Sequence, residues 1–485
     1  MKHVVIVGAG VSGLATAFHL GRLARQRGLE LRATVLESAT RPGGRVWTER
    51  TGGFQIELGA NGFLDSKRST IDLCRQVGLS DQLIAARPEA RTRYLFWNGR
   101  LHKLPTGPGS LVTSGLLSLG GKVRLVCERF IAARRDAGDE TVHEFASRRI
   151  GREAADVLID ALVTGIHAGD PTLLSAPAAF PRLIALEREY GSLMRAMSKL
   201  RKKRRAEQGN GPLPQPSPRS GEREKTGAGP GGTLWSLRGG MGQLIESLAE
   251  QCGGELVRGV QINAVRPGAE GGWSVEADGH DRWSADAVVL ACPSFTQAQL
   301  VETFDPDLTS LLSEIRYNSV VVVALGFRRS DIECDLAGFG YLSPQHKRRD
   351  VLGVLWSSTI FDHRAPAGMV LVQAMCGGWN RPDLVGWDDD RLVRSVRDEL
   401  RTSLQIEADA ALVRIVRWPQ AIPQYHVGHL ERLAAIELRR RQHAGLFLTG
   451  NSFRGIAVND CAEEAVRCAG EVVERLAAAE VTSRS

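Results

Sequence analysis

The first forty residues combine two patterns of apolar positions. Residues 4–7 are all apolar, which is typical of a central strand in a parallel sheet that is buried on both faces. Residues 14–26 place apolar side chains at helical spacing, and residues 31–36 form a second predicted strand. This order of strand, helix and strand predicts an α/β fold that begins with a Rossmann-like unit.

A glycine-rich turn joins the first predicted strand to the helix. Gly8, Gly10 and Gly13 have the spacing of a dinucleotide-binding turn. We expect Gly8 to allow the tight turn, Gly10 to let the backbone approach a diphosphate, and Gly13 to let the helix pack closely on the sheet. The diphosphate would bind the free N–H groups at the helix N-terminus, near Val11 and Ser12.

The residues that follow favour FAD over NAD. Glu37 ends the second strand beside Ser38, and its carboxylate would accept hydrogen bonds from a ribose diol. Gly43, Gly44 and Arg45 then place two flexible residues and a cation near the diphosphate. Ordinary NAD dehydrogenases continue into a helix there. This start of the chain resembles the FAD-binding segment of the amine oxidase and phytoene desaturase superfamily.

A second unit of strand, turn and helix near the other end predicts another contact with FAD. Residues 445–448 form a short apolar strand, and residues 461–479 form a predicted helix. The N-terminus of this helix would favour the electron-rich edge of a reduced flavin. Asp460 is expected to cap the helix and to contact the ribityl chain. The expected contacts are Gly450, Asn451, Val458 and Asp460.

Further cofactor contacts are expected from the middle of the chain. Gly59, Ala60 and Asn61 look like the superfamily segment that passes under the flavin ring. In that superfamily a strand like residues 255–265 gives a backbone contact to adenine, for which Ile262 is the candidate and Val260 the alternative. Trp418 is a further candidate. The FAD-binding domain is therefore predicted to be discontinuous, comprising residues 1–83, 233–300 and 410–485.

The inserted segments have other patterns. Residues 84–205 are mostly helical in pattern, and their basic end at residues 201–205 has two interpretations. It would contact anionic lipid, or it would be the solvated end of a core helix, which we favour slightly. Residues 206–232 are rich in Pro, Gly and Ser and predict a disordered loop. Residues 301–409 are rich in strand patterns and predict a mixed sheet in a substrate-binding domain.

Composition narrows the class of protein. The net charge of +7 is small for 485 residues, and no nucleic-acid recognition module is present. The eight cysteines form no C-x-x-C pair and no metal-like cluster, so we expect reduced thiols in a cytoplasmic protein and no metal. No apolar run is long enough to span a membrane, which restricts membrane contact to a peripheral one at the inner face of the cell membrane.

Four segments resemble protoporphyrinogen oxidases in order and spacing, and with the two FAD ends the likeness spans nearly the whole chain. They are residues 93–105, 165–171, 356–361 and the stretch from Trp418 to residue 425. The resemblance implies that Arg93 holds a propionate and that Gly169 is a pocket glycine. It also implies that Phe361 packs on a pyrrole ring and that Leu342 lines the pocket. One departure is Ala60-Asn61-Gly62, where many members have Pro-Asn-Ser.

The resemblance implies a reaction as well. Protoporphyrinogen IX would lose six electrons to give protoporphyrin IX, with molecular oxygen as acceptor and hydrogen peroxide as product, in heme biosynthesis. The flavin would take the hydride, and no catalytic acid or base is assigned. The product would pass to a ferrochelatase, and the protein would be a monomer or a homodimer.

Alternative functions stay open. A sister branch oxidises coproporphyrinogen III to coproporphyrin III; it typically lacks the arginine found here at Arg93, although Lys67 resembles a lysine of that branch. An amine oxidase would need an aromatic cage, of which the segment from Thr449 shows only Phe453. A carotenoid desaturase would not need Arg93. A porphyrin-binding flavoprotein scaffold is the non-enzymatic alternative.

Overall fold

A five-stranded parallel sheet is assembled from widely separated parts of the chain. In the computed structural model, which describes residues 1–105, 107–134, 138–209, 232–268, 271–280, 282–345 and 348–484, β1 is the central strand of this sheet. All its pairings are parallel, as expected for an apolar strand buried on both faces. The order of strands is β10 (Glu255–Arg258), β2 (Leu31–Glu37), β1 (Lys2–Val7), β14 (Ala287–Leu290) and β20 (Leu446–Leu448). The discontinuous Rossmann-like sheet predicted from the sequence is therefore present.

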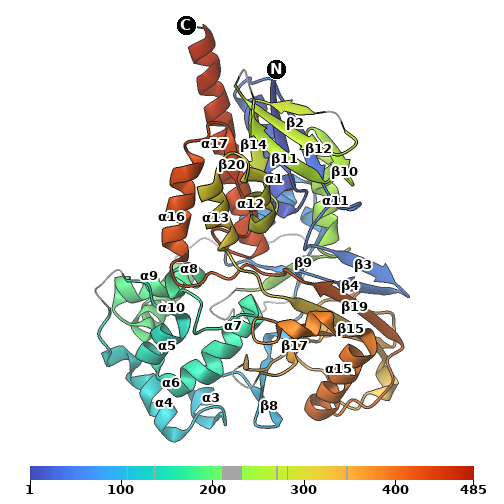
Figure 1. The fold of residues 1–485 in the computed structure, drawn as a ribbon. Helices are drawn as coiled ribbons and strands as arrows, with labels where there is room; N and C mark the ends of the chain where they lie inside the picture. Colours follow the sequence, from blue (N-terminus) through green and yellow to red (C-terminus); the bar gives the residue numbers. More distant parts are fainter. Residues whose placement is uncertain are drawn as a thin grey trace.

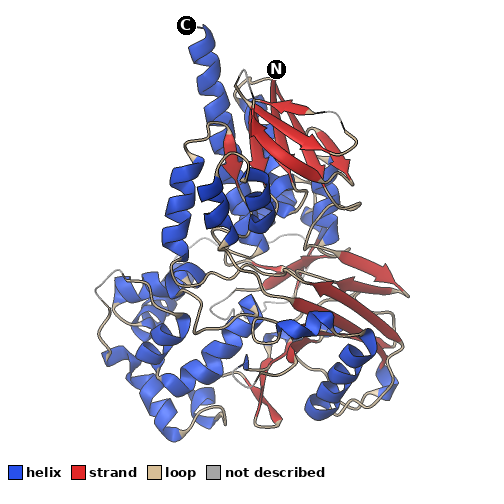
Figure 2. Ribbon diagram, in the orientation of Figure 1, coloured by secondary structure: helices blue, strands red, loops and turns tan. Residues whose placement is uncertain are grey.

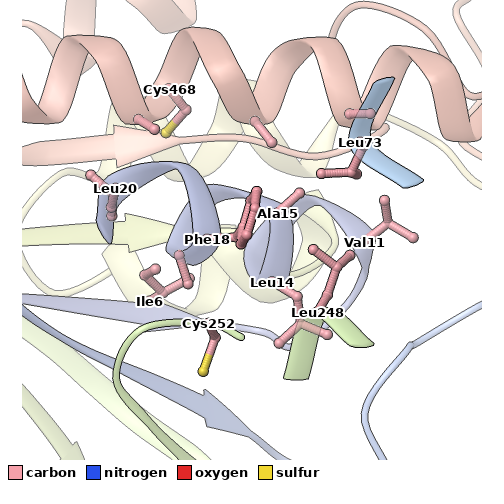
Figure 3. Close-up of a cluster of buried hydrophobic side chains, with 14 of the residues drawn as sticks. Ile6, Val11, Leu14, Ala15, Phe18, Leu20, Leu73, Leu248, Cys252 and Cys468 are labelled. Carbon is pink, nitrogen blue, oxygen red and sulfur yellow. The ribbon is translucent and has the colours of Figure 1, made fainter. Parts of the chain in front are cut away.

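Helices from both ends of the chain pack together over this sheet. Helix α1 (Val11–Gln26) lies against α17 (Val458–Arg484) and α11 (Gly242–Glu250). Figure 3 shows the apolar side chains between them, which include Leu14, Leu20 and Cys468. These side chains are excluded from water almost completely, so this cluster fixes the helix that follows the glycine-rich turn.

Smaller sheets flank the parallel sheet and lead to the second half of the molecule. All three are antiparallel; one has two strands, and one joins three short strands that are far apart in sequence. They are β11 (Ile262–Pro267), β12 (Trp273–Ala277) and β13 (Trp283–Ala285); β3 (Thr48–Thr51) and β4 (Phe54–Glu57); and β5 (Phe63–Leu64), β9 (Leu234–Leu237) and β6 (Leu83–Ala85). Helix α2 (Ser69–Gln76) packs on the C-terminal helix, α12 (Ser294–Val301) packs on β11, and α13 (Pro306–Ser313) packs on α12 and on α16 (His429–Arg440).

A seven-stranded mixed sheet forms the second half, below the parallel sheet in Figure 2. Helix α15 (Asp389–Leu404) packs on one face of it. The order is β19 (Leu412–Trp418), β15 (Val320–Arg328), β18 (Met369–Gly377), β17 (Val351–Leu355), β16 (Gly340–Leu342), β7 (Arg93–Trp97) and β8 (Arg100–Lys103). The sheet thus extends beyond the range 301–409, because β7 and β8 come from the stretch with a mostly helical pattern and β19 comes from the stretch assigned to the FAD-binding domain.

A group of helices lies beside the seven-stranded sheet (Figure 1). It contains α3 (Pro108–Thr113), α4 (Leu119–Val126), α5 (Val142–Ile150), α6 (Arg152–Ala154), α7 (Asp160–His167), α8 (Ala176–Ala179), α9 (Pro181–Tyr190) and α10 (Leu193–Gly209). Helix α10 continues to Gly209, so the first four residues of the predicted loop 206–232 are helical. Residues 210–231 of that loop lie outside the described residues.

The structure also describes the cysteines and the lengths of the helices. All eight cysteines are free thiols in the structure. Burial raises the pKa of several of them, including Cys74, to about 12, so that thiol is protonated at neutral pH. Of the helices in the described parts of the chain, none is long and apolar enough to cross a membrane.

Candidate cofactor and substrate site

The glycine-rich turn between β1 and α1 has the shape of an anion cradle. Gly8 has a φ of +106°, which favours glycine. A Cβ on Gly13 would lie 1.9 Å from the carbonyl oxygen of Gly8, so only glycine lets α1 begin this close to the sheet. A Cβ on Gly10 would meet no atom within 4 Å, and Gly10 gives α1 no side-chain cap. The open space and the uncapped N–H groups of Val11 and Ser12 fit a diphosphate.

The turn containing Gly43 and Gly44 lies against this cradle. Gly43 forms a parallel bridge with Gly10, and its N–H donates to the carbonyl of Ala9 at 2.8 Å. Gly44 has a φ of +54°. The segment Gly43-Gly44-Arg45 therefore lies beside the glycine-rich turn, and its contact with the diphosphate stays a prediction.

Arg45 has no carboxylate partner among the described residues. Its guanidinium donates to the carbonyl of Ala421 at 3.3 Å and to that of Gln420, and it lies over the ring of Trp418 at 5.1 Å. Burial lowers its pKa from the ordinary value. A half-buried arginine without a counter-charge fits an anionic ligand.

Glu37 lies at the carboxyl end of β2, beside the cradle. Its carboxylate accepts the N–H of Ala9 at 2.7 Å and that of Ala39 at 2.9 Å, and Ser38 follows it. The N–H of Val260 donates to the carbonyl of Glu37 at 2.9 Å. Ile262 at the start of β11 also uses its backbone, because it pairs with Ala277 of β12, so the adenine contact of Ile262, with Val260 as the alternative, stays a prediction.

The loop before α17 departs from the prediction in one respect. The helix begins at Val458 and not at Cys461, so Asp460 lies in its first turn and is not the N-cap. Its carboxylate instead reaches back to accept the N–H of Ala457 at 3.1 Å, and it also accepts the ammonium of Lys67 at 2.9 Å. An acid in this reciprocal position resembles an N-cap in sequence because both stabilise the first turn. Gly450, with a φ of +127°, and Asn451 precede this loop.

The segment predicted to pass under the flavin is fixed by close backbone contacts. A Cβ on Gly59 would lie 1.7 Å from the carbonyl oxygen of Arg45, so glycine is required there. The indole N–H of Trp418 donates to the carbonyl of Leu58 at 2.8 Å. A Cβ on Gly62 would lie 2.3 Å from the carbonyl oxygen of Trp235. This contact explains why the segment Ala60-Asn61-Gly62 has glycine where serine would collide with the backbone.

Phe339 lies between Arg93 and the cluster that contains Phe361. Strands β7 and β16 pair in parallel with Arg93 opposite Gly340, and the guanidinium of Arg93 lies 4.9 Å from the ring centre of Phe339. Phe339 in turn packs on the buried cluster that contains Phe361. Desolvation lowers the pKa of Arg93, and within the described parts of the chain no carboxylate pairs with it. The result is a cation at the edge of an aromatic wall.

Leu342 and Gly169 both lie near the C-terminal end of α7. Leu342 faces Gly165 in the last turn, and Gly169 follows the helix. A Cβ on Gly165 would meet the side chain of Leu342 at 2.7 Å, and a Cβ on Gly169 would meet the Oε1 of Gln424 at 2.2 Å. Met375 contacts both the apolar cluster around Ala168 and the cluster around Phe361. The four predicted substrate residues therefore surround one region of the seven-stranded sheet.

A buried ion pair that sequence reasoning missed supports this region. Arg364 lies over the ring of Phe361 at 5.3 Å and pairs with Glu57 at 3.3 Å, and both side chains are 2% exposed. Burial raises the pKa of Glu57, and the nearby Arg364 offsets only part of this effect. The pair links β4, which leads to the flavin segment, to the loop that carries Phe361. An isolated Glu and an isolated Arg give no signal in a sequence.

Comparisons with known proteins identify the family of the chain. The profile of the family described as flavin containing amine oxidoreductase matches residues 11–473. The chain is 28% identical to the coproporphyrinogen III oxidase of Bacillus subtilis (strain 168), over 96% of each protein. It is 32% identical to the chloroplastic protoporphyrinogen oxidase of Oryza sativa subsp. japonica, over 97% of this chain and 88% of that protein. The chain belongs to the flavin containing amine oxidoreductase family.

Solved structures show the same fold. A crystal structure from Exiguobacterium sp. 255-15, provisionally described as a protoporphyrinogen oxidase, has a TM-score of 0.80 at 25% identity over 97% of this chain and 98% of that one. Putrescine oxidase has a TM-score of 0.71 at 18% identity, which shows the fold alone. The cofactor is FAD, and the protein is an FAD-dependent oxidoreductase.

Proposed function

We propose that this protein oxidises protoporphyrinogen IX to protoporphyrin IX. The observation that carries the proposal is Arg93, a cation without a carboxylate partner in the described chain, at the edge of the wall formed by Phe339 and Phe361. A porphyrinogen is a large apolar ring with carboxylate arms, so it needs an apolar surface with a cation at its rim. Relatives bear the names protoporphyrinogen oxidase and coproporphyrinogen III oxidase.

The residues of the chain would bind and orient the ring. Bound FAD supplies the hydride acceptor, and three two-electron oxidations, with oxygen as acceptor and hydrogen peroxide as product, remove six electrons. Arg93 would hold a propionate, and Phe361, supported by Arg364, would pack on a pyrrole. His167 is close to Gly169, but burial lowers its pKa to about 4 and its ring packs between Phe180 and Tyr425. We therefore assign no acid or base.

The ion pairs of Lys67 favour protoporphyrinogen over coproporphyrinogen as the substrate. Its ammonium binds Asp460 at 2.9 Å and Glu463 at 2.8 Å. Burial alone would lower the pKa of Lys67, but these bonds raise it overall, so the charge is neutralised by the protein. Arg93 is then the candidate cation left for the substrate, and one cation suits a substrate with two propionates better than one with four.

A fluorimetric oxidase assay tests this proposal. Purified FAD-loaded protein would receive protoporphyrinogen or coproporphyrinogen, with Arg93→Ala compared to Arg100→Ala, an exposed arginine on the adjacent strand β8. We expect faster porphyrin formation from protoporphyrinogen, and a KM raised roughly tenfold by Arg93→Ala alone, from the loss of a charged hydrogen bond. Preference for coproporphyrinogen would move the protein to the sister branch. No turnover of either substrate would reject the porphyrinogen function.

We also propose peripheral contact with a membrane, through α4 and the turn η3 (Cys127–Phe130). Leu119, Val123, Val126 and Phe130 recur at helical spacing and are exposed, Leu119 by 79% and Phe130 by 74%. Arg129 lies among them, so the surface suits anionic lipid. The test is co-sedimentation with anionic and neutral vesicles. Val123→Ser with Phe130→Ser should abolish binding, whereas Leu438→Ser, on α16, should not.

Transfer to a ferrochelatase and a monomeric or dimeric state remain predictions.

A further inference from the structure

Residues 418–426, which we call the connector, touch predicted cofactor segments at both ends of the chain and the turn at residues 167–169. The connector begins at the last residue of β19 and runs between the FAD-binding region and the seven-stranded sheet. At its start, Trp418 and the carbonyls of residues 420 and 421 bind Leu58 and Arg45, as described above. Its end carries two adjacent side chains, Gln424 and Tyr425, that are both buried.

Tyr425 is bound to the loop that precedes α17. Its hydroxyl donates to the carbonyl of Asn451 at 2.5 Å and accepts the N–H of Gly455 at 2.9 Å. Its ring stacks on His429 with ring centres 4.1 Å apart. Burial raises its pKa well above the ordinary value, so the hydroxyl stays protonated and keeps both bonds. Tyr425 therefore fixes a loop that contains a predicted FAD contact.

Gln424 is bound to the substrate side. Its Nε2 donates to the carbonyl of His167 at 3.0 Å and to that of Ile422 at 3.1 Å, which fixes the orientation of the amide. Its Oε1 is buried, has no hydrogen-bond partner among the residues that the structure describes, and occupies the space where a Cβ on Gly169 would lie, 2.2 Å away. The glycine at position 169 is thus required by Gln424, before any substrate is considered.

We propose that Gln424 and Tyr425 are positioning residues that together set the distance between the flavin and the substrate. One peptide bond joins the side chain that fixes the 167–169 turn to the side chain that fixes the 451–455 loop. A displacement on either side is therefore transmitted to the other. The identity of the substrate rests on the proposed function, but the contacts themselves do not.

The first experiment compares Tyr425→Phe with Tyr341→Phe. Both tyrosines are buried and each makes two hydroxyl hydrogen bonds, but Tyr341 binds Glu399 and Ser403, away from the site. We expect Tyr425→Phe to weaken FAD binding about tenfold, measured as the dissociation constant of the reconstituted apoprotein by flavin fluorescence, and Tyr341→Phe to leave it unchanged. Equal dissociation constants for the two variants would overturn the role of Tyr425.

The second experiment is a double-mutant cycle of Gly169→Ala and Gln424→Ser. Gln424→Ser alone should raise the KM for protoporphyrinogen, because the 167–169 turn loses the amide that fixes it. We expect Gly169→Ala to raise this KM at least tenfold with a smaller change in kcat, and the double variant to be less impaired than Gly169→Ala because the serine vacates the space. The carbonyl of His167 keeps a donor in that variant, Asn318 at 2.8 Å. A double variant no better than Gly169→Ala would overturn the role of Gln424.

The same cycle separates this proposal from the proposed function. The Tm of the FAD-loaded protein should fall in Gly169→Ala and recover in the double variant, whatever the substrate is. Recovery of the Tm without porphyrinogen turnover in the wild type would reject the proposed function and keep the contact between Gln424 and Gly169. Porphyrinogen turnover by the wild type, with no recovery of KM or Tm in the double variant, would keep the proposed function and reject the contact between Gln424 and Gly169.

Discussion

The cofactor half of the candidate site is built mainly by backbone atoms, whereas the substrate half is built mainly by side chains. Around Gly8 and Gly13 the contacts are made by backbone atoms, and the glycines are required by distances to other backbone atoms. Around Arg93 and Phe361 the contacts are made by side chains from strands and loops that meet only in the folded protein. Substitutions in the first half should therefore disturb folding, and substitutions in the second half should mainly change affinity.

Gly13→Ala should have the largest effect. Its Cβ would lie 1.9 Å from a backbone oxygen that cannot move without displacing β1 or α1. We expect a loss of more than about 3 kcal/mol in the free energy of unfolding, and protein without FAD. Urea unfolding and the flavin-to-protein ratio measure both. Gly10→Ala is the matched control, since its Cβ has free space. It should leave stability unchanged but weaken FAD binding, and equal stability of the two variants would contradict this account.

Arg364→Met should have the next largest effect, because it breaks the ion pair between the two halves. We expect a loss of about 3 kcal/mol in unfolding free energy at neutral pH, as Glu57 is left buried without a counter-charge. Because the folded pKa of Glu57 is already raised, its contribution to stability falls as pH rises above the ordinary carboxyl value. The variant should raise that pKa further, so its deficit should grow with pH in that window.

Urea unfolding between pH 4 and pH 8 checks this sign. The deficit should be smallest at the acid end, where Glu57 is protonated in both the folded and the unfolded protein. Adding Glu57→Gln to Arg364→Met should remove the pH dependence. A deficit that grew on acidification would contradict the assignment.

Arg93→Lys should have a moderate effect that is confined to the substrate. Lysine keeps the charge but loses the planar pair of donors that suits a carboxylate. We expect the KM for protoporphyrinogen to rise about three- to fivefold with kcat and stability nearly unchanged, a loss of about 1 kcal/mol. Steady-state kinetics beside Arg100→Lys measure this. A change in FAD content would show that Arg93 belongs to the cofactor half.

Lys67→Met should have the smallest effect. The ammonium is paired with two carboxylates, but its side chain is 51% exposed, so the pairs contribute less than about 1 kcal/mol to stability. We expect a small loss of stability that shrinks in high salt and an unchanged KM. A large rise in the KM for coproporphyrinogen would show that Lys67 releases its partners to bind substrate.

The sequence predicted the β-α-β unit of the cofactor half well because its contacts join near neighbours. Gly8, Gly13 and Glu37 lie in one β-α-β unit, so their spacing already carries the geometry. The start of α17 was placed three residues late, because Asp460 has the residue type of an N-cap. Strand β7 was missed within a helical pattern, since its partner β16 is distant in sequence. The pairing of Glu57 with Arg364 was missed for the same reason, because the two residues are distant in sequence.

The strand order of the parallel sheet has a consequence for synthesis of the protein. Strand β1 emerges from the ribosome first, but its neighbour β14 lies at residues 287–290, and β20, at residues 446–448, pairs only with β14 among the described strands. The glycine-rich cradle is therefore exposed on an incomplete sheet until almost the whole chain has been translated. Such distant pairings slow folding and leave unpaired strand edges open to aggregation. Cellular yield should therefore depend on chaperones and on the supply of flavin.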